Sequence, residues 1–181
     1  MRSYVICLVL AASASAVAAP AAGITITQDS DPAMTVGEVV IDGDPGEVFA
    51  QVCDYHKWTE IMPDVAKVEI TDQKGDDAHV TLISPTGHRD NLMFHNQPQA
   101  RMIYFEDTGN HGRADVWAEI VFAPGQTANS TRVHIRLYAK IHGVATLVVH
   151  ESAVRAQREQ KIAADLEHIR DYFRRRVARS E

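Results

Sequence analysis

Histidines are the side chains best suited to acid–base or metal chemistry in this sequence, but their spacing forms no known type of site. The nine are His56, His79, His88, His95, His111, His134, His142, His150 and His168. No pair has the H-E-x-x-H spacing of a helical zinc site, and Cys7 and Cys53 do not have zinc-ligand spacing. His79 and His95 fall in runs that are candidates for neighbouring strands, so they could meet, although separate polar positions on a half-exposed sheet account for them better. The sequence therefore predicts no metal site and no cofactor.

Motifs for covalent catalysis and nucleotide binding are missing. The chain has no G-x-S-x-G or S-x-x-K motif, no G-x-G-x-x-G and no P-loop. Cys53 lies among apolar residues of a predicted helix, where a thiol is usually inert. We therefore predict no catalytic residue. An enzyme would need an acid–base pair inside a cavity, and His95, Tyr104 and Arg101 are candidates that the sequence alone does not place.

A charge interrupts the apolar stripe of the C-terminal segment. The stripe consists of Ile162, Leu166, Ile169, Phe173 and Val177, which step by three or four residues as one face of a helix does. Extended backwards, it passes Arg158 and Val154, so the helix begins between Val144 and Ser152. A charge on an apolar face must be paired or meet a polar group. One hypothesis is that Arg158 binds a ligand carboxylate or phosphate, with Glu151 or Tyr104 nearby. The alternative is that the helix bends or begins later, which leaves Arg158 in solvent.

The elements that must position these residues begin with a strand over 34–42, rich in valine and isoleucine. Asp44 is a good N-cap and Pro45 suits the first helical position, so a helix is predicted from Pro45 to about Cys53. A second short helix is predicted from Asp54 to Ile61.

Further strands are predicted at short intervals, separated by turns rich in glycine, proline and asparagine. They cover residues 65–71, 78–84, 89–96, 100–106, 114–123 and 131–141. The last run alternates apolar and polar residues, which is typical of an antiparallel sheet with one covered face and one wet face. A long helix follows.

The first residues have the pattern of a secretory signal peptide. Residues 1–18 contain Arg2, a short apolar run and the A-x-A cleavage signature Ala16-Val17-Ala18. We expect cleavage after Ala18 and a periplasmic or secreted protein. Residues 19–33 form a leader in which Ile24 and Ile26 alternate with threonines, so a short extra strand is possible, and residues 34–179 form the domain.

Composition excludes several classes of protein. The length of 181 residues suits one domain, and a hydrophobic content of 45% with 23% charged residues excludes wholesale disorder. The formal net charge of −6 disfavours nucleic acid as a partner, because phosphate binding needs a basic face. A basic cluster at 174–179 suits the end of a helix dipole, with transient contact to an anionic membrane as the alternative. The sequence does not indicate an oligomeric state.

Two motifs near the start of the domain carry a family resemblance. They are Val40-Ile41-Asp42-x-x-Pro45-x-x-Val48-Phe49 and Asp54-Tyr55-x-x-Trp58-x-x-x-Met62-Pro63-Asp64-Val65. Followed by a sheet and a long helix, they resemble the START-like (SRPBCC) superfamily, which includes the polyketide cyclase/dehydrase and Coq10-type START families. The resemblance covers about residues 40–178. It implies an α+β helix-grip fold, in which a curved antiparallel sheet of about seven strands wraps a long C-terminal helix, with two short helices after the first strand.

The resemblance also implies an apolar cavity, and the expected function follows from it. We expect an exported protein that binds or carries a hydrophobic small molecule (lipid, sterol or quinone-like) without chemistry. The alternatives are a cyclase-like or hydrolase-like enzyme acting on an apolar or aromatic substrate, and an interaction protein with a filled core. The candidate lining residues are Trp58, Leu82, Leu92, Phe94, Ile103, Phe105, Ile120, Phe122, Ile135, Arg158 and Ile162. A plain packed core would use the same apolar residues, and Trp58 could equally be a lid over the sheet edge.

Overall fold

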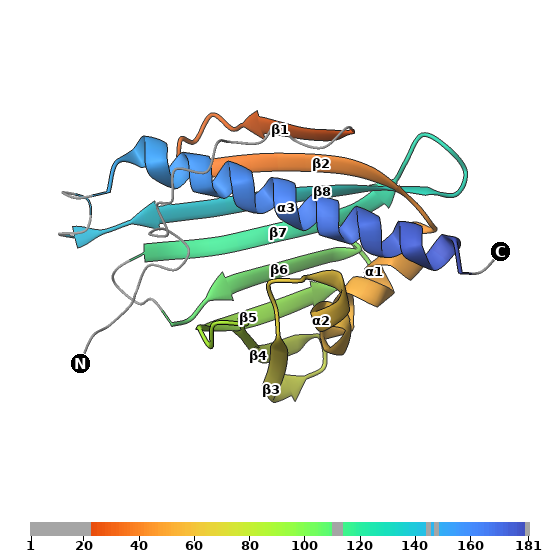
Figure 1. The fold of residues 1–181 in the computed structure, drawn as a ribbon, viewed down its shortest axis with the longest axis horizontal. Coiled ribbons are helices and arrows are strands. Elements are labelled where there is room, and N and C mark those ends of the chain that lie inside the picture. Colours follow the sequence, from red (N-terminus) through yellow and green to blue (C-terminus); the bar gives the residue numbers. More distant parts are fainter. Residues whose placement is uncertain (1–22, 110–113, 144–145, 147–148, 180–181) are drawn as a thin grey trace.

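One antiparallel sheet is the main element of the computed structural model, which describes residues 23–109, 114–143, 146 and 149–179 (Figure 1). Its eight strands follow the order β1-β2-β8-β7-β6-β5-β4-β3, with every neighbouring pair antiparallel. The strands are β1 (Ile24–Gln28), β2 (Met34–Asp42), β3 (Lys67–Lys74), β4 (Asp77–Ile83), β5 (Arg89–Gln97), β6 (Met102–Asp107), β7 (Ala114–Pro124) and β8 (Ser130–Ile141). The predicted curved sheet is confirmed. It has one strand more than the seven expected, because β1 forms within the predicted leader and pairs with β2. The predicted signal peptide lies outside the described residues.

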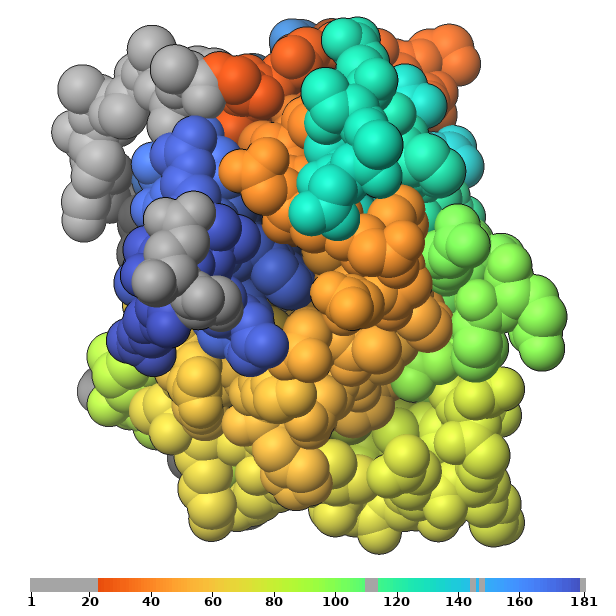
Figure 2. Space-filling view, turned by 90° about the vertical axis from the view of Figure 1, so that its right-hand side faces the viewer, coloured from red at the N-terminus to blue at the C-terminus, as the bar shows by residue number. Residues whose placement is uncertain are grey.

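Short helices follow β2 as predicted. Helix α1 (Pro45–Cys53) begins where Asp44 caps it, its carboxylate accepting hydrogen bonds from the backbone N–H of Gly46 at 2.8 Å and Glu47 at 3.2 Å. The 3-10 turn η1 (Tyr55–Lys57) and helix α2 (Trp58–Ile61) follow. Helix α1 packs against β7 and β8. In the view of Figure 2, α1 (orange) lies beside the C-terminal end of α3 (blue) and below the β7–β8 turn (teal).

The long C-terminal helix α3 (Glu151–Val177) lies across the inner face of the sheet (Figure 1). Its first residue falls within the predicted range. It packs mainly over β1, β2 and β8. Gly37 in β2 permits this approach, because a Cβ at that position would overlap Ile162 Cγ2 and lie 2.9 Å from Leu166 Cδ1. Among the described residues, no helix is both long enough and apolar enough to cross a membrane.

Candidate functional site

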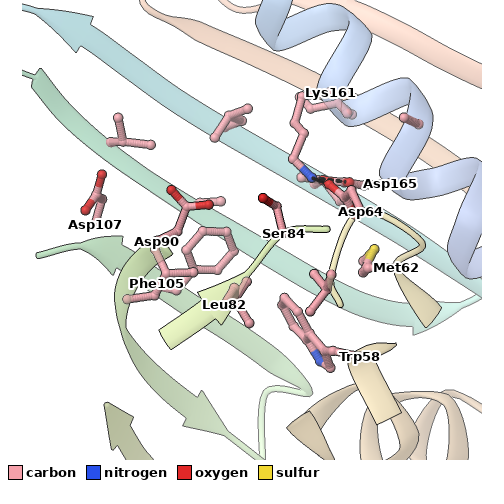
Figure 3. Close-up of a pocket in the computed structure, with 18 of the residues that line it drawn as sticks. Trp58, Met62, Asp64, Leu82, Ser84, Asp90, Phe105, Asp107, Lys161 and Asp165 are labelled. Atoms are coloured by element: carbon pink, nitrogen blue, oxygen red, sulfur yellow. Dashed lines mark hydrogen bonds and ion pairs between the residues drawn. The ribbon is translucent and has the colours of Figure 1, made fainter. Parts of the chain in front are cut away.

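A cavity of about 570 Å³ lies between α3 and the inner face of the sheet (Figure 3). Its apolar wall consists of Trp58, Met62, Val65, Leu82, Leu92, Phe105, Val116, Ala118, Ile120, Ile135, Leu137, Ile162 and Ala164. Its polar wall consists of Asp64, Ser84, Thr86, His88, Asp90, Asp107, Gln157, Gln160, Lys161 and Asp165. Volume, apolar lining and a few polar groups are the usual properties of a small-molecule site.

The cavity exists because α3 approaches one half of the sheet and not the other. Within the part of the chain that the structure describes, α3 packs closely on β1, β2 and β8, beside Gly37, but not on β4, β5 or β6. A twisted and curved sheet cannot be covered over its whole face by one straight helix. The remaining space is bounded by α2 and the segment after it, which contribute Trp58, Met62 and Asp64 (Figure 3).

Trp58 contacts both the protein interior and the cavity. Its indole Nε1 donates a hydrogen bond to the carbonyl of Val52 at 2.8 Å, so its polar atom is satisfied inside the protein. Its ring meets Phe94 edge-on, with 5.3 Å between centroids, and it also lines the cavity. Trp58 is therefore both a structural anchor of α2 and part of the cavity wall.

Seven of the eleven predicted lining residues face the cavity. They are Trp58, Leu82, Leu92, Phe105, Ile120, Ile135 and Ile162. Phe94, Ile103 and Phe122 are fully buried but do not line it. Phe94 packs behind Trp58, and Phe122 meets Phe49 of α1 edge-on at 5.9 Å. These positions lie toward the end of the sheet that α1 and α2 cover, so helix side chains fill the space in front of them.

Arg158, the remaining predicted residue, does not line the cavity either. Its side chain is 1% exposed, and its guanidinium donates to Thr35 Oγ1 at 3.1 Å and to the carbonyls of Ala139 at 2.9 Å and Pro32 at 2.5 Å. Glu151 Oε1 lies 3.2 Å away. The guanidinium therefore ties α3 to β2, β8 and the β1–β2 connection, and it is neither in solvent nor in the position proposed for binding a ligand.

The acid–base candidates taken from the sequence lie outside the cavity. His95 and Tyr104 are on the outer face of the sheet, where their rings are 5.8 Å apart and His95 Nδ1 contacts Asp77 Oδ1 at 2.9 Å. Arg101 is exposed in the β5–β6 turn with φ of 46°. Burial, followed by the nearby charge of Asp76, raises the pKa of the Cys53 thiol to about 12, which disfavours the reactive thiolate. Among the described residues no group of three or more histidine, cysteine or acidic side chains is placed to hold a metal ion.

A histidine–carboxylate pair that sequence reasoning missed lies inside the cavity. His88 Nε2 is 3.0 Å from Asp90 Oδ1, and both residues belong to the cavity wall. Burial raises the pKa of Asp90, His88 opposes this, and Asp107 raises it further. The sequence carries a signal for Asp90, because Leu92 and Phe94 are predicted to line the cavity from the inner face of the sheet. The strand alternation that places them there also places Asp90, two residues earlier, on that face.

A second charged group lies where α3 meets the segment after α2 (Figure 3). Lys161 Nζ is 2.5 Å from Asp165 Oδ1 and 3.4 Å from Asp64 Oδ2. Burial alone would lower the pKa of the Lys161 ammonium, but the two carboxylates outweigh it and hold that pKa above its usual value. Lys161 is therefore cationic and already paired.

Comparison with known proteins agrees with this geometry. Residues 33–174 match the model of the family described as polyketide cyclase / dehydrase and lipid transport. The chain belongs to this family. No curated protein matches the sequence.

Solved structures similar to this family member include an aromatase/cyclase and a lipid transfer protein. The Zhui aromatase/cyclase from Streptomyces sp. R1128 is 16% identical with a TM-score of 0.62, over 85% of this chain and 96% of that chain. A STAR-related lipid transfer protein from Xanthomonas axonopodis is 17% identical with a TM-score of 0.61, over 87% and 97%. A START superfamily protein from Mycobacterium smegmatis is 14% identical with a TM-score of 0.63, over 82% and 99%. At these identities the likeness shows the fold, and the START-like fold is thereby confirmed.

Proposed function

We propose that this protein binds and carries a hydrophobic small molecule, of the lipid, sterol or quinone-like type, without changing it chemically. The observation that carries the proposal is the cavity of about 570 Å³, most of whose lining residues are apolar. The family description, which names lipid transport beside cyclase activity, supports the same reading.

Binding of a neutral fluorescent probe, N-phenyl-1-naphthylamine, tests this proposal. Val116→Trp places a large side chain in the cavity, so we expect probe affinity to fall by about tenfold or more, because the added volume occupies the site. Val121→Trp is the matched control, because Val121 lies on the same strand but outside the cavity wall. Native mass spectrometry of the purified protein shows whether a lipid co-purifies with it. A wild-type protein that is always empty and never binds the probe would favour an interaction protein instead.

A second candidate function is a cyclase-like reaction, and the His88–Asp90 pair favours it. Asp90 contacts Nε2 of the imidazole, which leaves Nδ1 as the ring nitrogen able to accept a proton. A general base beside an apolar wall could remove a proton next to a ketone carbonyl, the first step of an aldol cyclisation. One of the similar structures is named as an aromatase/cyclase.

Deuterium uptake from D₂O next to the carbonyl of an apolar ketone, such as 2-tetralone, measures this activity. If the candidate is right, His88→Gln reduces the catalysed rate by about a hundredfold or more. His95→Gln leaves the rate unchanged, because the similar pair that His95 forms with Asp77 lies outside the cavity. Equal rates of deuterium uptake in the presence and absence of wild-type protein would rule out this enzymatic function.

We further propose that the protein acts after export, in the periplasm or outside the cell. The support is the signal-peptide pattern of residues 1–18. Cell fractionation tests it: full-length protein should appear outside the cytoplasm with a new N-terminus at Ala19, whereas a chain lacking residues 1–18 should remain inside. Transient contact of the basic end of α3 with anionic membrane also stays a prediction.

A further inference from the structure

The turn between β4 and β5 places several hydrogen-bonding groups in the wall of the cavity. Ser84, Thr86 and His88 all line it, and Figure 3 shows the Ser84 hydroxyl directed into the space between the sheet and α3. A ligand that fills the apolar part of the cavity must bring its polar end to such groups or out to solvent. The contacts that these three side chains already make determine which ligand group they can bind.

Hydrogen bonds fix the shape of this turn. The Ser84 N–H donates to the carbonyl of His88 at 2.9 Å, and the Gly87 N–H donates to the carbonyl of Ser84, also at 2.9 Å. Gly87 has a φ of 83°, which glycine adopts without strain. The turn therefore holds its side chains in place before a ligand binds, and this lowers the entropy cost of binding.

The hydroxyl groups of Ser84 and Thr86 offer a donor. Their oxygens are 2.9 Å apart, so one of the two hydroxyl protons lies between them. Ser84 Oγ also accepts a hydrogen bond from the His88 backbone N–H at 3.1 Å. Within the part of the chain that the structure describes, the two hydroxyl groups make these contacts and no others. The second hydroxyl proton can therefore be donated to an oxygen atom of a ligand.

The imidazole of His88 offers an acceptor. Its Nε2 is 3.0 Å from Asp90 Oδ1, and an ionised carboxylate can only accept, so the proton of the neutral ring belongs on Nε2. The other ring nitrogen, Nδ1, then carries a lone pair, and among the described residues it has no hydrogen-bond partner. The His88 side chain is 28% exposed, so a ligand can reach it.

The charged group around Lys161 is less suited to the polar end of a neutral ligand. Lys161 Nζ contacts Asp165 at 2.5 Å and Asp64 at 3.4 Å. A neutral ligand group would have to compete there with charge-assisted hydrogen bonds, which are stronger than neutral ones. The turn, by contrast, offers one donor and one acceptor without breaking a contact of the protein.

We propose that the cavity selects apolar molecules that end in a hydroxyl group over molecules of the same size that end in an ether or a ketone. A hydroxyl group both donates and accepts, so it can donate to His88 Nδ1 and accept the second proton of the Ser84–Thr86 pair. The apolar body of the ligand lies along Leu92 and Phe105. This inference rests on the proposed function, because it requires that the cavity binds an apolar ligand.

Three neutral probes of eleven carbons and one oxygen test the selection: 1-undecanol, its isomer 1-methoxydecane, and 2-undecanone. Each displaces N-phenyl-1-naphthylamine from the wild-type protein at pH 8. We expect 1-undecanol to bind about tenfold more tightly than 1-methoxydecane, with 2-undecanone between them because it accepts but cannot donate. Transfer out of water alone would favour the ether, which has no O–H group to desolvate. This ranking needs no variant, so it does not depend on whether a substitution disturbs folding.

Variants assign the donor and the acceptor separately. His88→Phe should bring the affinity for 1-undecanol to within about twofold of that for 2-undecanone, because both probes can then only accept. Ser84→Ala combined with Thr86→Val should bring 2-undecanone to within about twofold of 1-methoxydecane. His95→Phe is the matched control: His95 makes a similar contact with Asp77 outside the cavity, so this variant should keep the wild-type ranking. Circular dichroism melts check that all the variants are folded.

The possible failures are distinct. If the ether binds as tightly as its isomeric alcohol or more tightly, the selection is wrong and the proposed binding function stands. If His95→Phe reduces the preference as much as His88→Phe does, or if both turn variants keep the wild-type ranking, the selection does not originate in the turn and this inference is overturned. If no probe binds to wild-type protein, the proposed function fails together with the inference.

Discussion

The final helix meets the two halves of the sheet in different ways. Over β1, β2 and β8 it lies directly on the strands, with Gly37 admitting Ile162 and Leu166 and with Arg158 bonded to the backbone beneath. Beyond that contact it forms one wall of a cavity lined by inward side chains of β4 to β8. We call these the packed half and the hollow half. The comparison shows that one apolar stripe can serve as core on one side and as cavity wall on the other, and Ile162 takes part in both.

The largest expected effect on stability comes from Arg158, whose hydrogen bonds connect α3 to the packed half. Arg158→Met keeps an unbranched side chain of similar reach but leaves Thr35 and the carbonyls of Pro32 and Ala139 without their donor. Buried polar groups that lose a partner are costly, so we expect the free energy of unfolding to fall by about 3 kcal/mol. Urea denaturation measures it. Glu151→Gln is the control, with a change of at most about 0.5 kcal/mol, because Glu151 is exposed. An unchanged urea midpoint for Arg158→Met would mean that the hydrogen bonds of Arg158 do not stabilise the packed half.

The next effect concerns the contact between β2 and α3. Gly37→Ala places a Cβ where Ile162 Cγ2 lies, so we expect a loss of about 2 kcal/mol from overpacking. Ile162→Ala removes that Cγ2, and in a double-mutant cycle the cost of Gly37→Ala should become smaller. Additive effects in the cycle would show that Gly37 and Ile162 do not compete for space.

Local patterns in the sequence are sufficient to predict the helices and strands of the fold. Asp44 and Pro45 predicted the start of α1 because capping depends on neighbouring residues, and the structure begins α1 at Pro45. The alternation of apolar and polar residues in β8 likewise predicts its covered face, because successive side chains of a strand point to opposite faces of the sheet. The same alternation on β4 to β8 predicts that Leu82, Leu92, Phe105, Ile120 and Ile135 face inward, and these five residues line the cavity.

The features of the site that the sequence does not predict depend on contacts between distant segments of the chain. Phe94 and Phe122 share the inward alternation but lie under α2 and α1, and the strand period does not report where along a sheet a helix will cover it. The partners of Arg158 include Pro32 and Thr35, more than a hundred residues earlier in the chain. The alternation rule places Asp90 on the inner face, but His88 precedes β5, so that rule does not predict their contact.

Filling the hollow half should cost less than filling the packed half. Ala118 lines the cavity, so the three carbons added by Ala118→Leu can extend into existing space. We expect the free energy of unfolding to change by less than about 1 kcal/mol, against about 2 kcal/mol for Gly37→Ala. Urea denaturation of the two variants under identical conditions makes the comparison. A loss in Ala118→Leu equal to that in Gly37→Ala would indicate that the two halves are packed alike.

The smallest expected effect is a dependence of stability on pH that originates in the hollow half. Burial and Asp107 raise the pKa of Asp90, while His88 and Lys161 oppose this, so the folded chain binds the Asp90 proton more tightly than the unfolded chain does. The ionised carboxylate therefore opposes folding above its folded-state pKa, and this opposition disappears as the pH falls below the unfolded value of about 3.9.

Asp90→Asn removes that opposition, so its Tm should exceed that of the wild type at pH 7 by about 2 °C, and the difference should shrink toward zero near pH 4. Calorimetry at the two pH values measures it, with Asp72→Asn on the exposed strand β3 as the control. A lower Tm for Asp90→Asn at pH 7 would mean that the bond to His88 outweighs the burial of the carboxylate. Asp90 would then be a stabilising part of the cavity wall.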